Sequence, residues 1–128
     1  MSPKTFLLIS LGAVLGANAR YLLSTVAVAR WGDRFPWGTL IINVSGSFLL
    51  GLLLALVAGR AGGSPAARAL LATGFLGSYT TFSTFAAETV ALGGRGAYAP
   101  ALAYALGSVA LGVGAAGLGL LVGSRIAG

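Results

Sequence analysis

The chain has 128 residues, of which 57% are hydrophobic and 8% are charged, and its formal net charge is +6. A soluble domain carries roughly 25% charged residues, so this chain cannot cover a globular surface and is expected to be an integral membrane protein. It has no His and no Cys, and its only two acids, Asp33 and Glu88, lie in different segments. This inventory excludes zinc sites, thiolate nucleophiles and His-based acid–base chemistry, so we do not expect an enzyme.

Four apolar stretches are long enough to cross a membrane, which takes about 20 residues of helix. Their expected limits are residues 5–28, 38–58, 66–92 and 100–126. The connections between them are short and rich in turn-forming residues. The sequence therefore predicts an all-α membrane protein with one four-span domain over residues 1–128.

The basic residues are spread over the span ends, which indicates topology and membrane lipid as a partner rather than nucleic acid. Four of them fall on one membrane face and three on the other: Lys4, Arg60, Arg68 and Arg125 against Arg30, Arg34 and Arg95. An excess of one is too small to fix the direction of insertion. We therefore expect dual topology, with opposite copies pairing as an antiparallel homodimer.

Small residues recur at four-residue spacing within the spans. Gly12 and Gly16 form one such pair and Gly119 and Gly123 another. Helices in lipid associate through close packing, so these pairs predict helix–helix seams. Asn43, in the second span, is different, because a buried amide is costly unless it is paired. We take it as an unpaired donor at mid-span.

The third span contains an unusual polar segment, GFLGSYTTFSTF, at residues 74–85. Irregular backbone at membrane depth survives only where protein buries it or where it lines a wet cavity. We expect the helix to break here, with Gly74 and Gly77 allowing the backbone to leave helical geometry. Carbonyls freed by such a break commonly hold Na⁺ in transporters. The alternative is a glycine kink without an ion.

The polar groups inside the spans suit a small anion. The candidate hydrogen-bond donors are Asn43, Thr39, Ser83, Thr84, Tyr104 and Ser108. Phe82 and Phe85 share a helix face and offer ring edges that carry partial positive charge, and Arg20 is basic at mid-span. A path for cations would more often be lined by acidic residues, and Glu88 is the only acidic residue within the predicted spans. The alternative is structural. Each hydroxyl or amide would then form a hydrogen bond between neighbouring helices, and the two rings would only pack against other side chains.

Three motifs make the chain resemble the Fluc (CrcB) family of fluoride channels. They are LGANARY at residues 15–21, GTLIINVSG at residues 38–46 and GFLGSYTTFSTF at residues 74–85. The three motifs occur in the same order as in the family. The length of the chain and its four predicted spans also match the family, so the resemblance covers the whole chain. The resemblance implies a passive channel that exports fluoride across the inner membrane as an antiparallel dual-topology homodimer with two pores.

The same resemblance implies roles for individual residues. Those on or near the fluoride path would be Asn43, Phe82, Phe85, Ser83, Thr84, Tyr104, Ser108, Thr39, Glu88 and, in a vestibule, Arg20. A central Na⁺ would be held by the backbone carbonyls of Gly77 and Thr80 from both subunits. The family often has a further hydroxyl where this chain has Gly112.

Two other functions remain open at this point. A small proton-coupled multidrug exporter also has four spans and forms antiparallel dimers, but it needs an acid in the first span to exchange protons with its cargo. The only ionisable residue at depth in that span is Arg20. A structural or assembly subunit is the third possibility, and the polar break in the third span argues against it.

Overall fold

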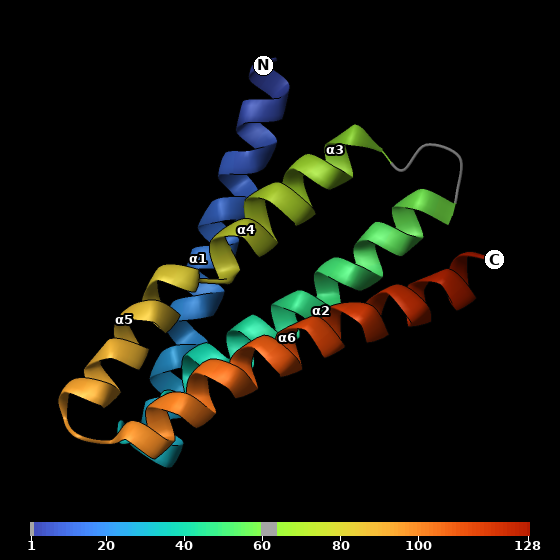
Figure 1. Ribbon diagram of the computed structural model, residues 1–128. Coiled ribbons are helices and arrows are strands. Elements are labelled where there is room, and N and C mark those ends of the chain that lie inside the picture. Colours follow the sequence, from blue (N-terminus) through green and yellow to red (C-terminus); the bar gives the residue numbers. More distant parts are fainter. Residues whose placement is uncertain (1, 60–63) are drawn as a thin grey trace.

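The computed structural model describes residues 2–59 and 64–128, and these residues fold into helices joined by short connections (Figure 1). In chain order the helices are α1 (Pro3–Trp31), α2 (Trp37–Gly59), α3 (Pro65–Ala67), η1 (Arg68–Leu76), α4 (Gly77–Tyr79), α5 (Phe82–Gly94) and α6 (Tyr98–Ala127). The predicted all-helical class is confirmed. The four predicted spans correspond to α1, α2, the succession from α3 to α5, and α6. The predicted loop at 59–65 falls largely outside the described residues, as does Arg60.

Within the described residues, three helices are each long and apolar enough to cross a membrane: Pro3–Trp31, Trp37–Ala58 and Tyr98–Ala127. The third span does not qualify as a single helix because it is divided. Large apolar side chains such as Leu7 and Leu15 on α1 and Leu106 and Leu121 on α6 remain exposed. This is the pattern expected of a protein whose outer surface faces lipid.

The helices pack through the predicted glycine seams. A Cβ on Gly12 would overlap the carbonyl oxygen of Leu70, and one on Gly16 would overlap that of Phe75, so α1 and η1 are in backbone contact. On the other side of the molecule, Gly119 and Gly123 bring α6 against the backbone of α2 in the same way. Both seams follow the rule that small residues let helices in lipid approach closely.

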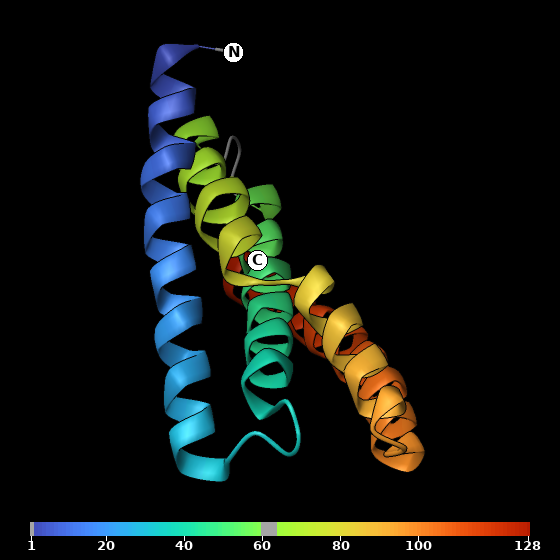
Figure 2. The ribbon, with the colours of Figure 1, turned by 90° about the vertical axis from the view of Figure 1, so that its left-hand side faces the viewer.

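The third span changes sides at its break. η1 and α4 lie beside α1, whereas α5 lies beside α6, and the chain crosses α2 between them (Figure 2). Before the crossing, η1 is a π-helix, a wide helix that occurs mostly in short pieces and often near functional sites. The break therefore places a stretch of extended backbone over the middle of α2.

The break itself is made by two threonines. Thr80 (φ −79°, ψ 158°) and Thr81 (φ −152°, ψ 111°) are extended, a conformation open to any residue. Gly77 is helical (φ −63°, ψ −29°), and Gly74 lies inside η1. The prediction that these glycines let the backbone leave helical geometry is therefore wrong. Gly74 serves close packing instead, because its Cα lies 3.0 Å from where a Cβ of Gly12 would stand.

We predict that Gly16→Ala lowers the stability of the protein. The added methyl group must displace the backbone of Phe75, and such overpacking costs about 1–3 kcal/mol. The thermal unfolding midpoint in detergent measures this effect. Gly93→Ala is the matched control, since a Cβ at that helical position meets no atom within 4 Å. Equal unfolding midpoints for the two variants would contradict the close packing of α1 against η1 at Gly16.

Candidate functional site

Asn43 holds the broken segment against α2. Its Nδ2 donates to the carbonyl of Thr81 (3.1 Å), and its Oδ1 accepts from the N–H of Thr81 (2.8 Å). One side chain thus satisfies both backbone groups of a residue that has left the helix, as a neighbouring strand would. The prediction that Asn43 is unpaired is therefore wrong. The amide nitrogen carries a second N–H beyond this pair of bonds.

Thr81 starts the second half of the span. Its Oγ1 accepts from the N–H of Thr84 (3.3 Å) and donates to the Thr84 hydroxyl (2.9 Å), so it caps α5. Thr81 was not among the residues predicted to contact ions. A threonine directly before the first residue of an apolar helix is a recognisable capping signal. Ser83 and Thr84, predicted on the path, lie exposed on this first turn.

A groove of about 430 Å³ opens beside the break, between α2, the third span and α6. It brings together half of the residues predicted to contact ions. Those in its lining are Asn43, Gly77, Thr80, Phe82, Phe85 and Ser108. Gly112, where a further hydroxyl was considered, lines it too.

Ser108 is notable within the groove. Its Oγ is buried and has no hydrogen-bond partner among the described residues. A buried hydroxyl without a partner is costly, so this donor is available to a ligand in the groove. The ring of Phe82 stands nearby and is 78% exposed on the single chain.

Glu88 gathers two of the predicted donors. The hydroxyl of Thr39 donates to Oε1 (2.9 Å), and the hydroxyl of Tyr104 donates to Oε2 (2.7 Å). Thr39 is 5% exposed and Tyr104 is 1% exposed. Bonds of this kind to a charged acceptor are among the stronger hydrogen bonds in proteins. The carboxylate of Glu88 therefore holds two hydroxyls that were predicted to contact the anion.

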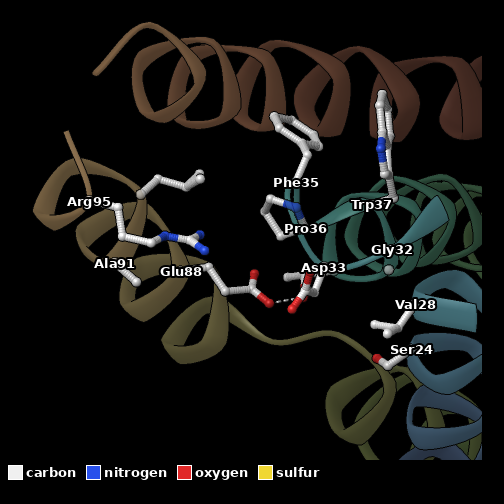
Figure 3. A pocket seen from close by; sticks show the side chains of 13 residues that line it. Ser24, Val28, Gly32, Asp33, Phe35, Pro36, Trp37, Glu88, Ala91 and Arg95 are labelled. Atoms are coloured by element: carbon white, nitrogen blue, oxygen red, sulfur yellow. Dashed lines mark hydrogen bonds between the residues drawn. The ribbon is translucent and has the colours of Figure 1, made fainter. Parts of the chain in front are cut away.

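A second cavity, of about 180 Å³, leads from Glu88 to the connections at one end of the spans. Figure 3 shows the Glu88 side chain pointing into it, with its bond to Thr39 dashed. The side chain of Arg95, at the end of α5, lies on the same side as Glu88. Asp33, from the connection between α1 and α2, also lines it. The two acids of the chain, distant in sequence, thus share one cavity with a basic residue.

A series of aromatic rings runs between the two cavities. Ring centroids are 5.6 Å apart for Phe82 and Phe85, 5.2 Å for Phe85 and Tyr104, 5.5 Å for Tyr104 and Phe35, and 4.6 Å for Phe35 and Trp37. These separations fall in the range of attractive ring pairs. The series starts at the break and reaches Trp37, the first residue of α2. Its first three members, Phe82, Phe85 and Tyr104, were predicted to lie on the path, whereas Phe35 was not.

Arg20 is not brought to these residues. It lies half-buried on α1 and lines neither the groove nor the second cavity. α1 packs on η1 and α4, on the far side of the break from α6. The vestibule role implied by the resemblance therefore stays a prediction.

The backbone at the break offers carbonyl oxygens. In a continuous helix the N–H of Thr81 would donate to the carbonyl of Gly77. Here it donates to Asn43 instead, so the carbonyl of Gly77 loses its helical partner. Carbonyl oxygens at broken helices suit Na⁺, and Gly77 and Thr80 both line the groove. The donor set at the break therefore fits the predicted cation.

Comparison with known proteins gives a consistent answer. The sequence profile of the family described as "CrcB-like protein, Camphor Resistance (CrcB)" matches residues 7–120. Proteins named "Fluoride-specific ion channel FluC" are similar over nearly their whole length. The one from Acidobacterium capsulatum is 46% identical over 121 residues, 94% of this chain and 97% of its own. Those from Roseiflexus sp. (47% over 119 residues; 93% of each chain) and Solibacter usitatus (48% over 120 residues; 94% and 98%) agree. The chain belongs to the CrcB family.

Proposed function

We propose that this chain is a passive fluoride channel of the inner membrane, which lets cells lose fluoride that has accumulated as the weak acid HF. The observation that carries the proposal is the groove at the break, whose lining has neutral donors and aromatic rings and no carboxylate. It is supported by relatives at 46–48% identity that are named fluoride-specific ion channels.

The lining suits a small, strongly hydrated anion. Such an ion enters only if protein donors replace its lost waters. The hydroxyl of Ser108 and the second N–H of Asn43 are two donors in the groove. The rings of Phe82 and Phe85 add positively polarised edges. From there the path continues along Tyr104 to the hydroxyls held by Glu88.

The path is completed by a second, inverted copy of the chain. Phe82 stands 78% exposed at membrane depth, and the polar Ser83 and Thr84 beside it are also exposed. Polar groups at this depth need cover from protein or water. An antiparallel partner that lays its own break against this one supplies the cover and forms two paths related by symmetry.

Na⁺ is the cation proposed between the two breaks. The carbonyls of Gly77 and Thr80 from both copies would hold it, and it would neutralise carbonyl dipoles that otherwise face one another. The proton-coupled exporter has no comparable support, because α1 carries no acid. A structural subunit would not need an unpartnered donor in a groove.

Purified protein in liposomes tests this function. The expected result is rapid fluoride efflux, followed with a fluoride electrode, that needs no proton gradient. Chloride and a lipophilic cation loaded in parallel liposomes should stay inside. Fluoride retention with release of the lipophilic cation would favour the exporter, and retention of all three solutes would favour the structural subunit.

We predict that Phe85→Leu and Phe82→Leu each reduce fluoride efflux clearly. Leu keeps apolar volume but removes the ring edge that faces the ion. Efflux rates from liposomes of equal protein content measure the effect. Phe6→Leu is the matched control, because Phe6 is 61% exposed on α1 and lies outside the groove. If both groove variants released fluoride at the parent rate, the two rings would contribute only to packing and not to transport.

A further inference from the structure

Phe35 is fixed in place by a tight turn at the start of α2. The N–H of Trp37 donates to the carbonyl of Phe35 (2.8 Å), so the turn has Pro36 as its central residue. The proline ring fixes its own φ, which leaves this turn little freedom. Figure 3 shows the ring of Phe35 directed toward the ribbon of α6 rather than away from the protein.

The ring of Phe35 packs on Tyr104 from the side of the connection between α1 and α2. The two rings are T-shaped, 5.5 Å apart at an interplanar angle of 78°. Phe85 contacts Tyr104 at 5.2 Å, and Trp37 contacts Phe35 at 4.6 Å. Tyr104 therefore packs against two phenylalanines, one from the path and one from a connection at the membrane face.

The orientation of the Tyr104 ring decides where its hydroxyl stands. That hydroxyl is 2.7 Å from Oε2 of Glu88, and Phe35 and Glu88 line the same cavity. If the ring of Phe35 were absent, the space left beside Tyr104 would allow its ring to tilt. The hydroxyl would then leave Glu88, and both groups would lose their present positions on the path.

We propose that Phe35 is a positioning residue of the fluoride path, which holds Tyr104 so that its hydroxyl stays on Glu88. The inference rests on the proposed function for its effect on transport. Under this proposal, a residue in the connection between α1 and α2 controls the hydrogen bond between Tyr104 and Glu88 inside the spans. Phe35 acts through Tyr104 and not by contact with the ion.

Fluoride efflux from four proteins tests the proposal: the parent, Phe35→Leu, Tyr104→Phe and the double variant. Phe35→Leu should slow efflux about fivefold, the factor that corresponds to one ring pair. The double variant should be no slower than Tyr104→Phe alone, since without the hydroxyl there is nothing left to position. Phe35→Tyr keeps the ring and should return efflux to near the parent rate. Phe6→Leu again serves as the control.

Two results would overturn the proposal. One is a double variant whose loss is the product of the two single losses, because Phe35 would then act independently of Tyr104. The other is a Phe35→Tyr variant as slow as Phe35→Leu. If Phe35→Leu fails to fold, Phe35→Met, which keeps most of the volume, takes its place in the same comparison.

The same four proteins separate this proposal from the function it rests on. A parent protein that moves no fluoride contradicts the proposed function. The thermal unfolding midpoints then still report whether Phe35 and Tyr104 are coupled. Additive changes in those midpoints would reject the contact-based inference whatever the transported ion.

Discussion

Replacing Asn43 by Asp is expected to slow fluoride efflux at least about tenfold, a loss of about 1.4 kcal/mol. A carboxylate accepts hydrogen bonds but donates none. It would face the carbonyl of Thr81 without the N–H that now bonds it, and it would bring negative charge into the groove. The thermal unfolding midpoint should fall as well, since the break loses one of its two ties to α2.

A neutral pair of variants separates the charge from the lost bonds. Asn43→Leu removes both bonds to Thr81 without adding charge, and it should also slow efflux and lower the midpoint. Asn18→Leu is the matched control, because the Asn18 amide bonds only within its own helix, to the carbonyl of Val14 (2.7 Å). Parent-like efflux from Asn43→Asp would remove Asn43 from the path.

Biasing the direction of insertion is expected to abolish fluoride resistance in cells. The Lys and Arg residues of the two membrane faces differ by one in the sequence, which is too little to fix an orientation. A reporter active only in the cytoplasm and another active only outside, each fused to the C-terminus of a separate copy of the protein, should both give signal. Lys residues added within 59–65 should silence the outside reporter and remove resistance.

A second chain, biased the other way, provides the control. Lys residues added near Arg95 should direct that chain oppositely, and co-expression of the two biased chains should restore resistance. Neither should confer resistance alone, because each lacks an inverted partner. If only one of the two reporters gives signal in the parent protein, dual topology is ruled out, and so is the antiparallel dimer proposed here.

Composition and spacing were enough to predict the spans and the seams. Apolar length locates the four spans to within a few residues, because lipid imposes a minimum helix length. The glycine pairs of α1 and α6 report close packing directly. The polar run in the third span indicates a break there, since polar backbone at that depth needs a special environment.

The position of the break depends on a contact that sequence spacing does not reveal. Asn43 and Thr81 are 38 residues apart, and their pairing makes the chain leave the helix at the threonines rather than at Gly77. The same long-range contact explains why Asn43 was wrongly expected to be unpaired. Phe35 was missed because nothing local marks a connection residue whose partner, Tyr104, lies on the last helix.

Current through a planar bilayer tests most directly that this protein is a fluoride channel. With a tenfold fluoride gradient, balanced in charge by an impermeant anion on the low-fluoride side, the current should reverse near the ideal value for a monovalent ion, about 59 mV. Replacing the fluoride gradient by a proton gradient of the same size should leave the reversal potential at zero. A reversal potential that follows protons, or the absence of any fluoride current from well-folded protein, would contradict the account.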